Sequence, residues 1–194
     1  MEFTIQQAKS SDCLQLAQYI NDSCDGAIEY LFDKQDEKDI ALEMMAQQLT
    51  RETHYSFANS IVANKDGLNI GMALSFPADG LIISEHLKQY YSPQRLRYIE
   101  YFVENKLNDS WHLDALCVSD ECRSQGVGTA LLDHVMQEAR KYEFKQLEVF
   151  VFATNTRAVE FYLRNGFMQQ SEIDTHDHEF LSVRSPLLLM SKNL

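Results

Sequence analysis

The chain has 194 residues, 45% of them hydrophobic and 24% charged, and its formal net charge is −12 at pH 7. This length and composition are typical of one globular domain, residues 1–194, with a modest insertion. The negative charge argues against a general nucleic-acid binder, because phosphates are met by clustered Lys and Arg, so we expect no nucleic-acid partner. The charge either attracts a cationic substrate or serves only solubility.

The cysteines and the apolar stretches indicate the compartment. None of the four cysteines forms a C-x-x-C pair, which argues against a zinc ribbon and a thioredoxin-type motif. The N-terminal residues lack the basic and then apolar run of a signal peptide, and no stretch of about 18 apolar residues is present to span a bilayer. We therefore expect a cytoplasmic protein with reduced thiols and no membrane partner.

Hydrophobic periodicity predicts the elements of the first half of the chain. Alternation indicates strands, and apolar residues at helical spacing indicate helices. The predicted elements are a strand around Phe3 and Ile5, helices over 13–24 and 36–52, a hairpin of strands 57–63 and 68–76 joined by 64–67, and a helical stretch over 79–107. Ser92 and Pro93 divide that stretch in two, as N-cap and first helical residue of the second piece.

The second half alternates strands and helices. The predicted elements are a strand over 111–118, a turn over 119–124, a helix over 126–142, a strand over 147–152, a helix over 155–165 ended by Gly166, and two strands within 167–191 around a polar turn near 174–178. A hairpin mixed with crossovers predicts an α/β (mixed α+β) fold, with one central mixed β-sheet flanked by helices on both faces.

The string from Arg123 to Ala130 follows a predicted strand and opens a predicted helix. The first turn of a helix has unpaired backbone N–H groups and positive potential. Gly126 and Gly128 let that backbone approach an oxyanion, so the string is suited to a pyrophosphate. No P-loop string G-x-x-x-x-G-K-S/T is present, and Leu131 stands where a dinucleotide fingerprint needs its third glycine.

A second motif runs from Asn155 to Phe167. With both motifs in this order, the chain resembles the GNAT superfamily of N-acetyltransferases. The first string is similar to that family's R/Q-x-x-G-x-G/A signature, and the second to its N-x-x-A-x-x-x-Y-x-x-x-G-F segment. The clear resemblance covers about residues 111–167.

The resemblance implies acetyl-CoA as cofactor and assigns residues to it. It implies that main-chain amides of the first string hold the CoA pyrophosphate: Arg123, Ser124, Gln125, Gly126, Val127, Gly128 and Thr129. It implies that the preceding strand binds the pantetheine arm through Leu116, Val118 and Cys117, that Asn155 also contacts the pantetheine, and that Tyr162 lies near the sulfur. Many family members have glycine where this chain has Ser124.

The acetyl transfer needs a neutral amine and a stabilised leaving group. Alternation along the strand places His112, Asp114 and Leu116 on one face, and the first two resemble positions that serve the family as base. Each could instead be a structural residue with satisfied hydrogen bonds. The Leu116 N–H can stabilise the oxyanion. Because full proton transfer from Tyr162 to a thiolate is uphill by about 2 kcal/mol, we expect a hydrogen bond instead, and direct attack by the amine needs no acyl-enzyme on Cys117.

The stretch 79–107 is longer than a simple connection needs. We expect that it lines the acceptor pocket, with aromatic and acidic side chains holding an amine: Tyr90, Tyr91, Glu100 and Glu104. The alternative is a packing or dimerisation element, which leaves a homodimer open. His176 and His178 suggest an exposed turn rather than a metal site, because no defined ligand spacing accompanies them.

The function predicted from the sequence is acetyl-CoA-dependent N-acetyl transfer to a primary amine, on a small molecule or on a peptide or protein. The alternative is a CoA-binding regulatory or interaction module without turnover. A nucleotide-binding domain is disfavoured because both nucleotide motifs are absent.

Overall fold

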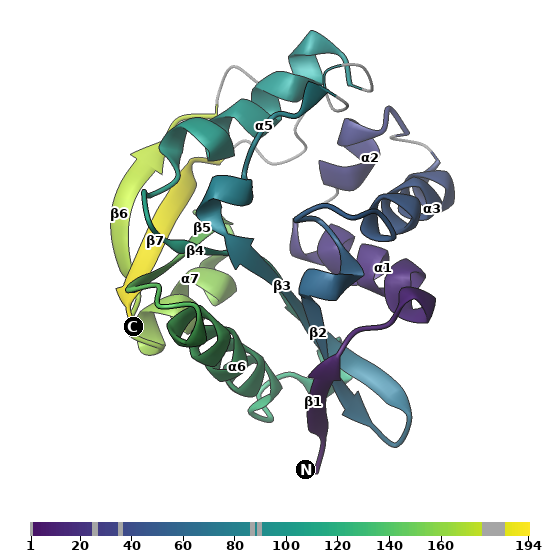
Figure 1. The fold of residues 1–194 in the computed structure, drawn as a ribbon, viewed down its shortest axis with the longest axis vertical. Helices are drawn as coiled ribbons and strands as arrows, with labels where there is room; N and C mark the ends of the chain where they lie inside the picture. The colour runs from purple at the N-terminus through teal and green to yellow at the C-terminus, as the bar shows by residue number, and fades with distance from the viewer. Residues whose placement is uncertain (1, 25–26, 35–36, 86–87, 89–90, 176–184) are drawn as a thin grey trace. The chain divides into compact units, whose positions relative to one another are not determined.

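The computed structural model describes residues 2–24, 27–34, 37–85, 88, 91–175 and 185–194 (Figure 1). Its strands form a seven-stranded sheet in the order β1-β2-β3-β4-β5-β7-β6, which confirms the predicted mixed α/β class. The chain divides into two compact units, Met1–Phe76 with Leu113–Glu138, and Pro77–His112 with Ala139–Leu194. Each unit is therefore built from two separate stretches of sequence.

Four neighbouring strands of the sheet lie wholly or mostly in the first unit: β1 (Thr4–Gln7), β2 (Ser60–Lys65), β3 (Leu68–Pro77) and β4 (Trp111–Val118). The strand β2 pairs antiparallel with both β1 and β3. The predicted hairpin is confirmed, because β2 pairs with β3 antiparallel and the turn residues Asp66 and Gly67 have φ of 52° and 84°. Two successive positive φ values are typical of the type I′ turn, whose twist matches that of paired strands.

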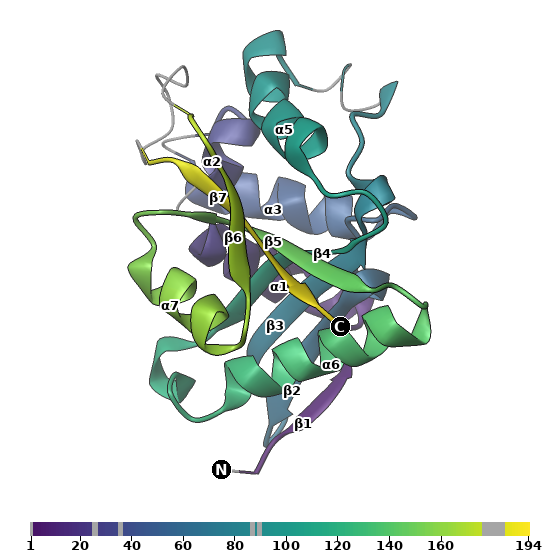
Figure 2. The same ribbon diagram turned by 90° about the vertical axis from the view of Figure 1, so that its left-hand side faces the viewer.

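Four helices belong wholly or mostly to this unit: α1 (Cys13–Ser23), α2 (Ala27–Leu31), α3 (Lys38–Leu49) and α6 (Val127–Lys141). Figure 2 shows α6 in front of β2 and β3, with α1 and α3 behind them. The Tyr19 hydroxyl and the Gln15 amide both donate to the Asn69 carbonyl, at 2.7 and 3.0 Å, and so tie α1 to β3. The short helix α2 is absent from the sequence prediction.

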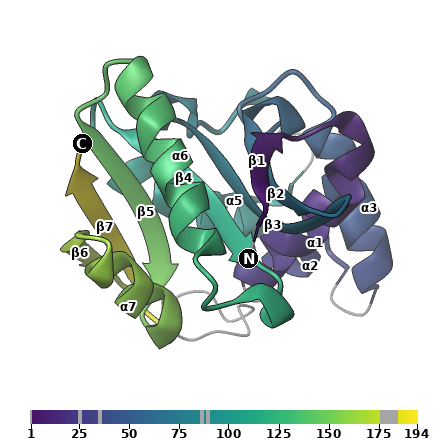
Figure 3. The same ribbon diagram turned by 90° about the horizontal axis from the view of Figure 1, so that it is seen from below.

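The second unit contains β5 (Gln146–Phe152), β6 (Met168–Ile173) and β7 (Leu187–Asn193), with helices α5 (Pro93–Asn105) and α7 (Thr156–Arg164). The strand β7 pairs antiparallel with both β5 and β6 (Figure 3). The chain order β5-β6-β7 is thus rearranged in the sheet. The polar turn predicted near 174–178 lies largely outside the described residues.

The stretch 79–107 is only partly helical as predicted. Its second piece is α5, where the Ser92 hydroxyl accepts the Arg95 N–H at 3.4 Å and Pro93 starts the helix, which confirms the predicted cap. The prediction of a helix in the first piece is wrong over residues 81–84, which follow the short 3-10 turn Ala78–Gly80 and are not helical. There the Leu81 carbonyl accepts a hydrogen bond from Lys106 Nζ at 2.6 Å, a tertiary contact that takes the place of a helical one.

The helix α5 rests on the sheet of its own unit through aromatic rings. Tyr98 meets Phe102 edge to face at 5.2 Å between ring centroids, and Phe102 meets Phe150 of β5 at 5.1 Å. Such pairs add to the free energy gained by burying apolar area. Among the described residues, no helix has the length and apolar character required to cross a membrane.

Candidate active site

The segment between β4 and α6 forms the predicted cradle. Ser124 and Gly126 both have left-handed backbone, with φ of 60° and 85°, and they turn the chain into α6. The Ala130 amide donates to the Gly126 carbonyl at 3.0 Å, so the amides of residues 127–129 precede the first backbone hydrogen bond of the helix. A Cβ at Gly126 would meet no atom within 4 Å, so this side of the turn is open. The geometry is that of an anion site at a helix N-terminus.

The left-handed φ of Ser124 gives a physical reason for the glycine found at this position in many GNAT members. An L-residue in this conformation costs about 1 kcal/mol or more, a cost that glycine avoids. Ser124 keeps the shape of the turn while accepting that cost.

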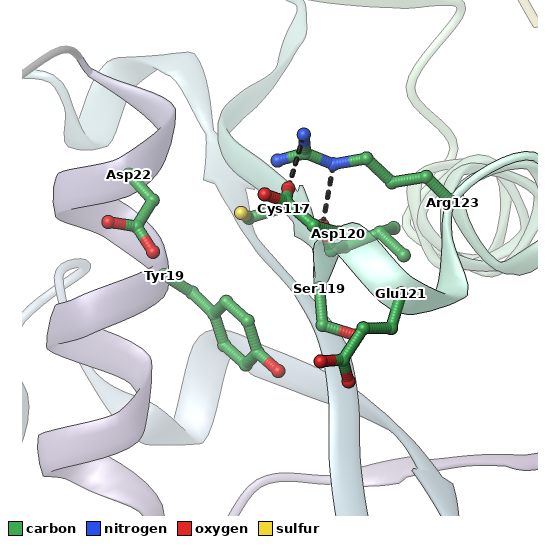
Figure 4. A pocket seen from close by; sticks show the side chains of 8 residues that line it. Tyr19, Asp22, Cys117, Ser119, Asp120, Glu121 and Arg123 are labelled. Atoms are coloured by element: carbon green, nitrogen blue, oxygen red, sulfur yellow. Dashed lines mark hydrogen bonds and ion pairs between the residues drawn. The ribbon is translucent and has the colours of Figure 1, made fainter.

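Arg123 holds the cradle to the end of β4. Its Nε donates to the Val118 carbonyl at 3.0 Å, and its guanidinium forms an ion pair with Asp120 (Figure 4). The Gln125 amide donates to the Glu121 carbonyl at 2.7 Å and closes the same turn. Because Asp120 balances the charge of Arg123, the main-chain amides remain the main source of attraction for an anion.

A pocket of about 510 Å³ lies beside the cradle in the first unit. It is lined by two side chains of α1 and by the end of β4 with the following turn: Tyr19, Asp22, Cys117, Val118, Ser119, Asp120, Glu121 and Arg123 (Figure 4). The sequence predicted Cys117, Val118 and Arg123 for the cofactor. It missed Tyr19 and Asp22, because periodicity along α1 does not reveal which strand that helix faces.

The thiol of Cys117 is poorly suited to nucleophilic catalysis. Its pKa is raised to about 11, chiefly by burial and then by the carboxylates of Asp22 and Asp120, against the lowering effects of Arg123 and a backbone hydrogen bond. A thiol with this pKa carries very little thiolate at neutral pH. This agrees with direct attack rather than an acyl-enzyme.

The strand β3 approaches β4 closely at Gly71. A Cβ built there would lie 2.9 Å from the Cys117 carbonyl oxygen and 3.3 Å from side-chain carbons of Val118 and Leu131. Only glycine leaves this carbonyl in place. The position of the predicted pantetheine strand therefore depends on a residue of its neighbour.

In the second unit, His112 forms a buried pair with Glu148 that was not predicted from the sequence. Its Nδ1 lies 3.2 Å from Glu148 Oε1, and the two side chains are 2% and 0% exposed. Glu148 Oε2 accepts the Leu107 N–H at 2.6 Å, so this carboxylate joins β5 to the end of the insertion. The available signal was a single carboxylate within the otherwise apolar run Leu147 to Phe152.

Asp114 differs from His112 in keeping a half-buried side chain. Its charge acts on the thiol of Cys24 at the end of α1. Asp114 therefore lies within electrostatic reach of the helices α1 and α2, and Leu116 on the same strand is also half-buried.

Asn155 and Tyr162 belong to α7 in the second unit. The Asn155 side chain caps this helix, because its Oδ1 accepts the Ala158 N–H at 3.2 Å. Tyr162 is 6% exposed and meets Phe161 and Phe167 at 5.3 and 5.2 Å between ring centroids. Burial raises the pKa of the Tyr162 phenol above its usual value, so it stays protonated at neutral pH.

Three of the four residues predicted to line the acceptor pocket lie within the described ranges. Glu100 and Glu104 are exposed on α5, and Tyr91 is half-buried ahead of that helix. Tyr90 lies outside the described residues, as do His176 and His178. Within the described ranges, no group of His, Cys, Asp and Glu has the arrangement of a metal site.

The sequence model of the acetyltransferase (GNAT) family matches residues 26–167. An N-acetyltransferase from Staphylococcus aureus Mu50 shares the fold with a TM-score of 0.74 at 14% identity, covering 97% of this chain and 100% of that chain. An agmatine N-acetyltransferase has a TM-score of 0.72 at 14% identity, covering 100% of both chains. An acetyltransferase from Salmonella typhimurium solved with its cofactor acetyl-CoA has a TM-score of 0.59 at 15% identity, covering 100% of this chain and 95% of that chain. Among curated proteins, none matches the chain in sequence.

Proposed function

Since the chain belongs to the acetyltransferase (GNAT) family, we propose that it transfers the acetyl group of acetyl-CoA to a primary amine by direct attack. The observation that carries this proposal is the turn at Ser124 and Gly126, which leaves the amides of residues 127–129 ahead of the first hydrogen bond of α6. Successive amides at a helix N-terminus suit a diphosphate, and the family's cofactor contains one.

The cofactor site that we propose follows the cradle and the adjoining strand. The pyrophosphate lies on the amides of residues 123–129. The pantetheine lies along Leu116, Cys117 and Val118, and Asn155 donates to it through Nδ2, because Oδ1 is used by the helix cap. The pocket formed in part by Cys117, Val118 and Arg123 supports this assignment.

The proposed chemistry gives separate tasks to Asp114 and Tyr162. An amine with a pKa near 10.4 is almost fully protonated at pH 7, so about one molecule in 2,500 can attack. Asp114 keeps solvent exposure, and we assign to it the task of orienting the amine and passing its proton to water. His112 is buried against Glu148, and we propose that this pair holds the strand rather than acting as the base. Tyr162, kept protonated by burial, donates a hydrogen bond to the departing thiolate.

A cationic acceptor is favoured by two observations. The chain carries a net charge of −12, which raises the local concentration of cations. One structural relative is an agmatine N-acetyltransferase, and agmatine carries a guanidinium group in addition to its primary amine. The second candidate function, a CoA-binding module without turnover, has no observation in its favour.

The experiment compares two glycines with the same backbone. Gly126 and Gly67 have φ of 85° and 84°, and a Cβ at either position meets no atom within 4 Å. Replacement by Ala therefore costs each about the same backbone strain, on the order of 1 kcal/mol. We expect Gly126→Ala to weaken acetyl-CoA binding in a calorimeter by at least about tenfold, and Gly67→Ala to leave it unchanged.

Turnover is measured as thiol release from acetyl-CoA with a panel of amines. Release that depends on the amine supports the transferase. Tight cofactor binding without release for any amine would favour the module. Equal binding of acetyl-CoA by the two glycine variants would show that the cradle is not part of the cofactor site.

A further inference from the structure

A buried side chain of α1 and a half-buried side chain of α2 form a polar pair in the first unit. Asn21 is 4% exposed, and its Nδ2 donates to Glu29 Oε1 at 3.1 Å. Asn21 Oδ1 and Glu29 Oε2 are also buried, and neither has a hydrogen-bond partner in the part of the chain that the structure describes. The pair is thus bonded internally and still presents two unpaired acceptors.

Rotation of the amide cannot remove this deficit. If the Asn21 amide were flipped, its oxygen would face the carboxylate of Glu29 and lose the only hydrogen bond between them. Buried acceptors without donors cost free energy, and the cost is larger for a carboxylate. A donor from outside the chain would relieve both atoms together.

The surroundings favour a donor that carries positive charge. The pKa of the Cys24 thiol is raised to about 12, chiefly by burial and in part by the carboxylates of Asp114 and Glu29, while backbone hydrogen bonds lower it. Cys24 lies next to Asn21 and donates to its carbonyl at 3.6 Å. Glu29 from α2 and Asp114 from β4 are both half-buried and both act on this thiol, and two negative charges near one point attract a cation.

We propose that Asn21 Oδ1 and Glu29 Oε2 bind an ammonium or guanidinium group of the acceptor, on a nitrogen other than the one that is acetylated. This inference rests on the proposed function. A nitrogen paired with a carboxylate is held in its charged form, and a charged nitrogen has no lone pair with which to attack. The acceptor that fits is therefore a diamine or an amine with a guanidinium group, and a monoamine lacks the group that Glu29 binds.

The test compares 1,4-diaminobutane with butylamine, two amines of the same chain length. We expect the wild type to have a kcat/KM at least tenfold higher for the diamine. Glu29→Gln keeps the shape of the side chain, and its new amide can donate to Asn21 Oδ1, so this variant should be at least as stable as the wild type. Its kcat/KM for the diamine should fall at least tenfold, while that for butylamine stays within twofold.

Glu37→Gln is the matched control. Glu37 loses the same charge in the same unit, but it is half exposed and paired with Lys34 at 2.9 Å. We expect its ratio of diamine to butylamine activity to equal that of the wild type. Asn21→Ala removes one of the two acceptors and provides a second variant, for which the same ratio should fall by a smaller factor.

The outcomes separate this inference from the proposed function. If the wild type acetylates amines and Glu29→Gln keeps the wild-type ratio, the inference is wrong and the transferase assignment stands. The same conclusion holds if Glu29→Gln melts well below the wild type while the ratio is unchanged, since the pair would then be structural. If no amine is acetylated, the binding of 1,4-diaminobutane is measured by calorimetric titration. Binding to the wild type that is lost in Glu29→Gln supports the cation site. Equal binding of the diamine to the two proteins overturns it.

Discussion

The phenol of Tyr162 is enclosed by aromatic rings and shielded from water. A phenol whose pKa is raised by burial cannot hand its proton to a thiolate of lower pKa without a large cost, but it can donate a strong hydrogen bond. Tyr162→Phe keeps the ring and removes the donor. We expect kcat to fall by about 100-fold, the scale of one lost donor to developing charge, with little change in the KM for acetyl-CoA.

Steady-state kinetics with saturating amine would measure this effect. Tyr142→Phe is a suitable control, because Tyr142 is 59% exposed and stacks on Trp111. A variant at Tyr162 with wild-type kcat would show that the hydroxyl has no part in the reaction.

Because the phenol of Tyr162 is buried, the free energy of unfolding depends on pH in the alkaline range. The pKa of Tyr162 is raised above its usual value of 10.0, so the unfolded chain loses this proton before the folded chain does. The stabilisation is therefore complete below about pH 10 and is lost as the pH rises through the folded pKa. We expect the urea midpoint of the wild type to fall more steeply between about pH 9.5 and 11 than that of Tyr162→Phe. Parallel curves would contradict the buried environment assigned to Tyr162.

Among the elements, the helix α7 depends on the cap supplied by Asn155. Asn155→Ala should lower the free energy of unfolding by about 1 kcal/mol, while Asn155→Asp should preserve it, because Asp is an equally good N-cap. Both variants lack Nδ2, so both should weaken acetyl-CoA binding by about tenfold if the amide donates to the pantetheine. Urea denaturation measures the cap, and calorimetry measures the cofactor contact. Wild-type affinity in Asn155→Asp would assign this residue to capping alone.

The elements that the sequence predicted well are those whose signals are local. The bounds of β4 match the predicted 111–118, and the hairpin turn follows from Asp66 and Gly67. The five-residue helix α2 was missed because so short a helix shows no periodicity, and it carries Glu29. The contacts that position the site are tertiary, as with Gly71 against the Cys117 carbonyl, and one sequence contains no record of them. The position of the cradle could therefore be predicted from sequence motifs. The pairs of Glu148 with His112 and of Glu29 with Asn21 could be found only from the three-dimensional structure.

At the scale of the whole molecule, an acidic protein binds a polyanionic cofactor. The net charge is −12, and Arg123 beside the cradle is balanced by Asp120. In the cofactor site that we propose, attraction for the pyrophosphate comes from short-range amide hydrogen bonds, while the long-range field repels CoA. The same field attracts the cationic acceptor that we propose, and under this proposal the two substrates experience opposite forces on approach.

Salt should therefore act in opposite directions on the two substrates. Raising the ionic strength from about 0.01 to 0.5 M shortens the Debye length from about 30 Å to a few ångströms and screens the long-range field. We expect the association rate of acetyl-CoA, followed by stopped-flow, to rise severalfold, because repulsion is removed while the amide contacts persist. The KM for 1,4-diaminobutane should rise over the same range, and that for an uncharged amine analogue should change little. A steep fall in the CoA association rate would mean that unpaired Lys and Arg side chains, rather than the amides of the cradle, capture the cofactor.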